Sequence, residues 1–130
     1  MPARTGPMMQ REPAPSGPVV TGFSGTGFKI GDTLYPTGLW ITPSEAHSWD
    51  APAFDELNAA TFAPFLALSP PPEFLLLGTG ATMRALPAAL RQAIEAGGVG
   101  VEAMDSRAAA RAWGVLRGEG RWIVAALMPL

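Results

Sequence analysis

The stretch FLLLGTGATMRALP, residues 74–87, decides the fold. An apolar run without alternation stops at Gly78-Thr79-Gly80, and a proline that can open a helix follows at Pro87. A strand that is covered on both faces has such a continuous apolar pattern. The stretch therefore predicts a central strand over 74–77, a sharp turn at the two glycines and a helix that starts at Pro87.

The segments after this stretch alternate between helix and strand. We expect a helix over 87–98 that stops at two glycines, a strand over 99–104, a helix over 107–117 and a last strand over 121–128. Asp105 and Ser106 are placed to cap the second helix, and Ala109, Trp113 and Leu116 give it one apolar face. Strands joined through helices indicate an α/β fold whose strands are at least partly parallel.

The segments before the stretch differ in character. Residues 19–42 have apolar strand segments separated by glycine-containing turns, which predicts a β meander. Pro36 and Gly38 interrupt its third segment, and a proline inside a strand indicates an edge or a bulge. An irregular edge of this kind leaves a homo-oligomer open as a possibility. Residues 50–69 should contain a short helix that Thr61 could cap.

The chain of 130 residues fits one domain, which buries roughly two thirds of its unfolded surface. Residues 1–18 are rich in Pro and Gly and show no apolar periodicity, so we expect a flexible tail there. We expect a single α/β domain over 19–130, with a mixed β-sheet, flanking helices and a smaller layer made by the β meander.

Composition and charge exclude several classes of function. The formal net charge is −2 and the nine basic residues are scattered, so nucleic acid is not an expected partner. The apolar run 122–130 is far below the ~20 residues that span a bilayer, and no secretory signal is visible. One His and no Cys predict no metal centre and no disulfide. Eight of the nine basic residues are Arg, which suggests a bacterial source with GC-rich DNA.

The glycine pair could instead belong to a dinucleotide-binding site. Glu102 and Asp105 follow at about the distance at which a Rossmann acid contacts the ribose. However, the third glycine of that fingerprint is replaced by Met83, and the expected helix starts too far beyond Gly80 to offer its N-terminus to a phosphate. We therefore interpret Gly78 and Gly80 as a structural turn and predict no cofactor.

Two other groups of residues have the composition of a site. Ser44, His47 and Asp50 are close in sequence, as in a catalytic triad, but a triad depends on spatial convergence, so a solvent-facing or capping role for His47 is the better interpretation. Glu119 and Arg121 flank a turn after the last helix. They could form a surface ion pair, or they could be a recognition point for a partner.

The segments GFSGTGFKIGDTLYPTGLWITPSEAHSW, FLLLGTG and VEAMDSRAAARAWGVLRGEGRWIVAALMP together resemble one family. This family has bacterial and archaeal members of undefined activity and includes mitochondrial respiratory complex I assembly factor 3. The similarity covers roughly residues 20–129. Its most specific residues are Gly25-x-Gly27-Phe28, Gly38, Trp49, Gly78-x-Gly80, Asp105-Ser106, Ala109, Leu116 and Glu119-x-Arg121.

The resemblance implies a compact fold with a mixed β-sheet, flanking helices and a smaller β layer, and it implies no established catalysis. Relatives usually show Thr-Phe/Tyr-Asn where this chain has Ala112-Trp113-Gly114, so two polar side chains are missing here. We therefore expect a non-enzymatic interaction module that assists a membrane-associated respiratory complex of the complex I type. It would bind protein partners in the cytoplasm or at the periphery of the inner membrane.

The residues expected to contact a partner or ligand lie in the second half of the chain. Buried aromatic and Arg anchors usually supply most of the energy of a protein interface. An alternative is a small-molecule binder or enzyme that uses the crevice beyond the carboxyl ends of the strands. The candidate contacts for the two hypotheses together are Thr79, Gly80, Asp105, Trp113, Glu119 and Arg121.

Overall fold

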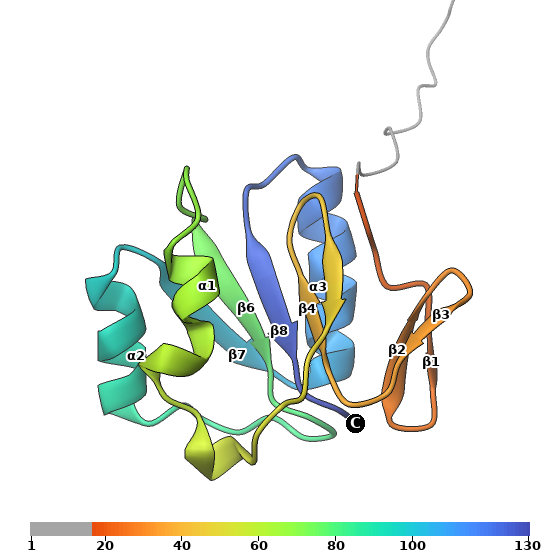
Figure 1. Cartoon of the computed structure of the whole chain (residues 1–130), viewed down its shortest axis with the longest axis horizontal. Helices are drawn as coiled ribbons and strands as arrows, with labels where there is room; N and C mark the ends of the chain where they lie inside the picture. The colour runs from red at the N-terminus through yellow and green to blue at the C-terminus, as the bar shows by residue number, and fades with distance from the viewer. Residues whose placement is uncertain (1–16) are drawn as a thin grey trace, which may run out of the picture.

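A sheet of five strands lies at the centre of the computed structural model, which describes residues 17–130 (Figure 1). The strands are β4 (Leu39–Ile41), β5 (Ala46–Ser48), β6 (Phe74–Gly78), β7 (Gly100–Met104) and β8 (Val124–Leu127), in the order β5-β4-β8-β6-β7. Strand β6 pairs in parallel with both β7 and β8, whereas β4 is antiparallel to β8 and β5. The predicted mixed sheet in an α/β fold is confirmed.

Strand β6 is apolar throughout because both of its faces are covered. Leu75 and Leu77 belong to the hydrophobic cluster on one face of the sheet, and Leu76 belongs to the cluster on the other face. All three side chains are at most 1% exposed. Successive side chains of a strand point to opposite faces, so a strand between two layers needs apolar residues at every position. The central strand predicted from the sequence is confirmed.

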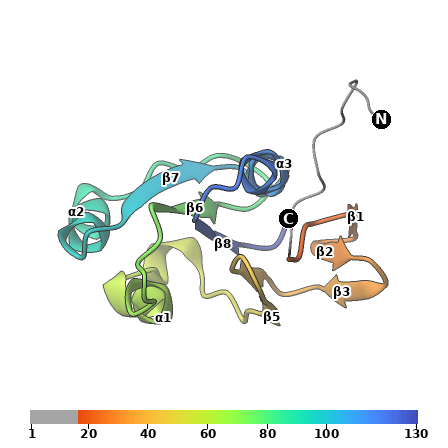
Figure 2. The ribbon, with the colours of Figure 1, turned by 90° about the horizontal axis from the view of Figure 1, so that it is seen from above.

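Helices cover the two faces of the sheet (Figure 2). One face carries α2 (Ala88–Ala96), the short α1 (Ala63–Leu66) and two 3-10 turns, η1 (Phe54–Glu56) and η2 (Ala59–Phe62); the other face carries α3 (Ser106–Gly118). Strand β7 lies on one side of β6 and β8 on the other, so the two crossover connections run in opposite directions. Right-handed crossovers therefore place α2 and α3 on opposite faces.

The ends of α3 and its buried face follow from local sequence. The Asp105 carboxylate accepts a hydrogen bond from the Ala108 amide at 2.9 Å, which confirms the predicted cap. Ala109 and Trp113 are 0% exposed and pack on the sheet. The Trp113 indole N–H donates to the Pro18 carbonyl at 2.9 Å, so the chain is already attached to the fold at residue 18.

A second sheet of three antiparallel strands lies beside the first one, where Figure 1 draws it at the right. Its strands are β1 (Gly22–Ser24), β2 (Gly27–Ile30) and β3 (Thr33–Tyr35). Phe28 of β2 is 0% exposed within the α3 cluster, and the Leu130 amide donates to the Thr26 carbonyl at 2.8 Å. The buried Phe28 ring, the partly buried Ile30 and Tyr35, and the hydrogen bond from Leu130 thus attach the small sheet to the rest of the fold.

The expected meander over 19–42 is wrong in one respect, because its last segment leaves the small sheet. Pro36 and Gly38 do not interrupt a strand; they lie in the link that carries the chain from β3 to β4. Gly38 has φ of +138°, and a Cβ there would lie 2.7 Å from the Trp49 carbonyl oxygen. The link turns sharply at a position that only glycine can occupy, and it delivers β4 to the edge of the five-stranded sheet next to β8.

Other boundaries also differ from the sequence-based prediction. Strand β5, which pairs with β4, is not among the predicted strands, because its exposed residues show no apolar alternation. Asn58, not Thr61, is the N-cap of η2, and Thr61 completes a capping box with it. The last strand is shorter than the expected 121–128 and begins at Val124. Residues 1–16 of the predicted tail lie outside the described part of the chain.

Candidate functional site

The loop at Gly78–Gly80 lies where the carboxyl ends of the parallel strands meet. The connection that leaves β6 goes to one face of the sheet and the connection that leaves β7 goes to the other, so a crevice is expected between them. Thr79, Gly80 and Asp105, which the sequence suggested as neighbours, do come together here. Ser106 joins them.

Both amides of the loop are engaged within the chain. The Thr79 amide donates to the Met104 carbonyl at 2.8 Å, and the Gly80 amide donates to the Ser106 hydroxyl at 2.9 Å. The Ser106 amide in turn donates to the Gly80 carbonyl at 2.8 Å. A phosphate cradle needs backbone N–H groups that point at the ligand. The N–H groups of this loop instead join β6 to the start of α3.

The Thr79 side chain is also used inside the loop. Its hydroxyl donates to the Thr82 carbonyl at 2.7 Å and accepts from the Arg84 amide at 3.0 Å. The residue is only 6% exposed. Such local hydrogen bonds from a side chain to the backbone stabilise a turn that lies outside helices and strands. They engage the Thr79 hydroxyl within the loop that borders the crevice of the small-molecule hypothesis.

Ser106 is the residue that closes this corner, and the sequence indicated it only as part of a helix cap. Its hydroxyl donates to the Met128 carbonyl at 2.7 Å while it accepts from Gly80, and the residue is 0% exposed. A Cβ on Gly78 would lie 2.6 Å from the Ser106 hydroxyl oxygen and 2.9 Å from its Cα. Glycine at 78 is therefore required by the approach of α3 to the strand.

The other predicted contact residues lie elsewhere. Trp113 is 0% exposed in the core between α3 and the sheet. Glu119 is exposed just beyond the C-terminal end of α3, and Arg121 follows it near the amino ends of β6 and β8. The six candidate residues therefore do not form one site. Thr79, Gly80 and Asp105 lie at one end of the sheet, and Glu119 and Arg121 lie at the opposite end. The buried Trp113 ring lies between the two groups.

Arg121 pairs with Glu73 rather than with its neighbour Glu119. Its Nε and Nη2 atoms lie 2.9 and 2.7 Å from the same carboxylate oxygen of Glu73, and the Trp122 amide lies 3.3 Å from the other one. The Trp122 indole N–H donates to the Pro70 carbonyl at 3.1 Å, although the residue is 41% exposed. We call Pro70, Glu73, Arg121 and Trp122 the Arg121–Trp122 corner.

Hydrogen bonds within this corner shift the pKa values of Glu73 and Arg121. The hydrogen bond from Arg121, followed by that from the Trp122 amide, lowers the pKa of the Glu73 carboxyl below its usual value. The same hydrogen bond raises the pKa of the Arg121 guanidinium. Both groups stay charged near neutral pH, and their hydrogen bonds join the segments that enter β6 and β8.

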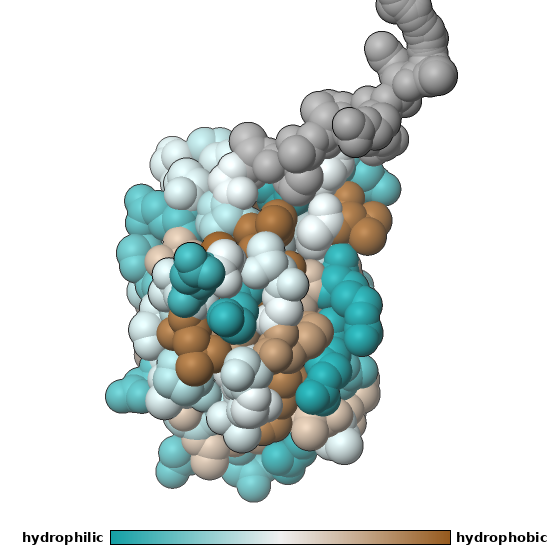
Figure 3. Space-filling model, turned by 90° about the vertical axis from the view of Figure 1, so that its right-hand side faces the viewer, coloured by the Kyte–Doolittle hydropathy of each residue, from teal (hydrophilic) through white to brown (hydrophobic). Residues whose placement is uncertain are grey.

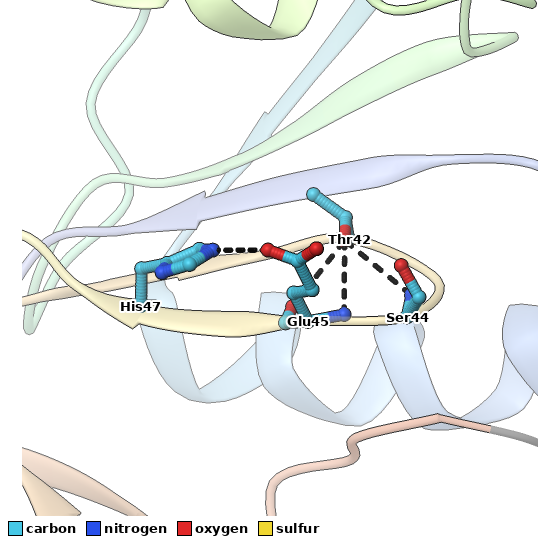
Figure 4. Close-up of polar contacts among 4 residues, drawn as sticks. All are labelled: Thr42, Ser44, Glu45 and His47. Atoms are coloured by element: carbon cyan, nitrogen blue, oxygen red, sulfur yellow. Dashed lines mark hydrogen bonds and ion pairs between the residues drawn. The ribbon is translucent and has the colours of Figure 1, made fainter.

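The residues near His47 form a hairpin contact (Figure 4). The His47 Nε2 atom lies 2.7 Å from a Glu45 carboxylate oxygen, and both side chains are exposed. The Thr42 hydroxyl accepts from the Glu45 amide at 3.0 Å and from the Ser44 amide at 3.4 Å. The side chain of His47 therefore meets Glu45 and not Ser44, which fits the predicted solvent-facing role.

Two further findings concern the described residues as a set. Within residues 17–130, His, Asp and Glu side chains form no group of three or more that could hold a metal ion. No helix in that part of the chain has the length and apolarity needed to cross a membrane.

The model of one protein family matches residues 20–128, which is most of the chain. The chain belongs to the DUF498/DUF598 family of proteins of unknown function. An uncharacterized protein of Rhodobacter capsulatus is 36% identical to it over 124 residues, which cover 95% of this chain and 94% of the relative. The resemblance found in the sequence is thereby confirmed.

A second relative and a solved structure are also similar to this chain. NADH dehydrogenase [ubiquinone] 1 alpha subcomplex assembly factor 3 of Danio rerio is 31% identical over 123 residues, which cover 94% of this chain and 70% of the fish protein. A crystal structure of a Bordetella parapertussis protein superimposes with a TM-score of 0.79 at 32% identity, and the match covers 91% of this chain and all of that one. The DUF498/DUF598 chain thus shares its fold with a solved bacterial protein.

Residues through which this chain resembles the DUF498/DUF598 family have structural explanations. Gly38, Gly78 and Ser106 are places where two backbones approach each other closely. Glu73 is the partner of Arg121 that the sequence analysis did not find, because the local sequence around Glu73 or Arg121 does not indicate that the two strand beginnings are neighbours. The one indication in the sequence is that Glu73, a charged residue, directly precedes the buried strand β6.

Proposed function

We propose that this protein is a non-enzymatic interaction module that assists the assembly or stability of a membrane-associated respiratory complex of the complex I type. The observation that carries the proposal is the 31% identity to a complex I assembly factor over 94% of this chain. The module would act on protein partners, in the cytoplasm or at the periphery of the inner membrane. A role in assembly requires a surface that binds a client and does not require a catalytic constellation.

The geometry supports a binding role more than a small-molecule site. The crevice residues Thr79 and Gly80 are buried, and their polar groups are bonded within the chain. The Arg121–Trp122 corner instead presents an Arg and a Trp to solvent, and these two residue types are enriched among the residues that carry interface energy. The indole N–H bond to the Pro70 carbonyl holds the Trp122 ring, and the amide bond to Glu73 holds its backbone, before any partner arrives, which reduces the entropy lost on binding.

The proposal is tested in a bacterium that carries this gene and a proton-pumping NADH dehydrogenase. A tagged full-length copy should recover subunits of the peripheral arm, and deletion of the gene should reduce the amount of assembled NADH dehydrogenase in native gels. Recovery of none of these subunits, together with normal assembly in the deletion strain, would contradict the proposal.

Variants then test the corner itself. Truncation of an interface anchor costs about 2 kcal/mol or more, which is roughly a thirtyfold loss of affinity. Trp122→Ala should therefore lose most of the recovered subunits. Met83→Ala is the matched control, because Met83 is 57% exposed in the loop at the opposite end of the sheet. Equal loss in both variants would argue against a contact at the corner.

A further inference from the structure

A shallow hollow of about 110 Å³ lies between α3 and the segment that enters β1. Its lining residues are Val20, Thr21, Gly22, Phe23, Ala110 and Arg111. Figure 3 looks onto the side of the molecule that carries the three-stranded sheet, and it shows apolar surface next to strongly hydrophilic surface. The hollow joins two parts of the fold that are far apart in sequence, and none of the functional residues discussed above lies in it.

Two arginines stand at this hollow without a carboxylate. Arg107 and Arg111 are exposed, and neither forms an ion pair within residues 17–130. The Arg107 guanidinium lies 5.5 Å from the centroid of the Phe23 ring, which is 36% exposed. A cation over an aromatic face keeps its positive charge and stays available to an anion at its outer side.

The charge of α3 contrasts with that of the whole chain. The helix Ser106–Gly118 contains three arginines and no Asp or Glu, whereas the protein has a formal net charge of −2. Residues four apart on a helix have Cβ atoms about 5–6 Å apart, so Arg107 and Arg111 make one local positive site. Two charges are far fewer than nucleic acid binding uses, but they suit two carboxylates on a peptide.

We infer that this hollow, with Arg107 and Arg111 at its rim, is the binding site for an acidic segment of a partner protein. Two carboxylates of the segment pair with the two guanidiniums, and an apolar side chain between them covers Phe23 and enters the hollow. The inference rests on the proposed function in one respect only, that the ligand is a protein.

Two other occupants fit the surface less well. Residues 1–16 of this chain carry two Arg and one Glu, so their charge does not complement the site. A second copy that meets this surface through the same surface would bring arginines rather than carboxylates. Self-association through this surface would show as backbone amide shifts that depend on protein concentration when no peptide is present, and that result would overturn the assignment to a partner protein.

The test uses the full chain and a fluorescein-labelled helical peptide in which pairs of Glu four residues apart alternate with Leu. A matched peptide has Gln at each Glu position. Fluorescence anisotropy should show binding of the Glu peptide that weakens as salt is raised, because exposed charges are screened. Arg111→Glu should weaken binding by about tenfold or more. Arg84→Glu is the control, since it makes the same change of charge at a half-exposed arginine elsewhere.

Mapping by NMR locates the site independently of any variant. Amide shifts on addition of the Glu peptide should concentrate at residues 20–23 and 107–111. The inference is overturned if the Gln peptide binds equally well, if Arg84→Glu and Arg111→Glu lose binding to the same extent, if the shifts lie elsewhere, or if no shift occurs. If the peptide test fails but the deletion strain lacks assembled NADH dehydrogenase, the inference is wrong and the proposed function still holds. If the deletion strain assembles NADH dehydrogenase normally, the proposed function is wrong and the peptide-binding result still holds.

Discussion

Replacement of Ser106 by alanine tests whether the Gly78–Gly80 loop is held for architectural reasons. The Ser106 hydroxyl bridges two backbone groups, since it accepts from the Gly80 amide at 2.9 Å and donates to the Met128 carbonyl at 2.7 Å. The residue is 0% exposed, so water does not reach the hydroxyl in the folded protein. Ser106→Ala removes both bonds and leaves both backbone groups buried without this partner.

The size of the effect follows from these two groups. A buried donor or acceptor that loses its partner costs about 1–3 kcal/mol, so two such groups cost roughly 2–6 kcal/mol. Alanine is the better helix former by ~0.5 kcal/mol, which offsets a little of this loss at the first position of α3. We expect a net loss of about 2–5 kcal/mol, which is a large share of the ~5–15 kcal/mol that stabilises a typical domain.

Equilibrium unfolding in urea, followed by tryptophan fluorescence, measures this loss. With an m value of about 2 kcal/mol/M, the midpoint should fall by roughly 1–2.5 M. Ser24→Ala is the control, because Ser24 is exposed on β1 and should change the midpoint little. A change in free energy below about 0.5 kcal/mol for Ser106→Ala would refute the reasoning, since the bridge would then contribute nothing to the fold.

Three further changes test other parts of the structure. Gly114→Ala should stabilise the protein by ~0.5–1 kcal/mol in the same urea assay, because a glycine inside a helix costs that much and, beyond the neighbouring residues and the backbone of its own helix, the added Cβ meets no atom within 4 Å; a destabilised variant would contradict this. Glu73→Gln should destabilise most at neutral pH: the folded-state pKa of Glu73 is depressed, so its contribution is present above its ordinary pKa of 4.5 and is lost as pH falls through the folded-state pKa. Equal urea midpoint differences from wild type at pH 7 and pH 3 would count against the bond to Arg121. Gly38→Ala should lower the melting temperature and cost ~1–3 kcal/mol, because the new Cβ would meet the Trp49 carbonyl at φ of +138°; an unchanged melting curve would show that the link can relax.

The family resemblance and the fold prediction drew on the same residues. Glycines at 38 and 78, which carried part of the resemblance, lie where a Cβ would approach backbone or side-chain atoms at 2.6–2.7 Å. These positions specify how strands and helices meet. They explain why these residues indicate the fold.

Local patterns determined the elements of this protein. The apolar run of β6, the Asp105 cap and the glycine stop after α2 each depend on residues within a few positions of one another, so they were visible in the sequence. The tertiary structure alone decided which elements became neighbours. Arg121 contacts Glu73 across 48 residues instead of Glu119 at two, and β4 leaves the small sheet for the large one. Such choices depend on which apolar faces pack together, and that free energy is a property of the whole chain rather than of any segment.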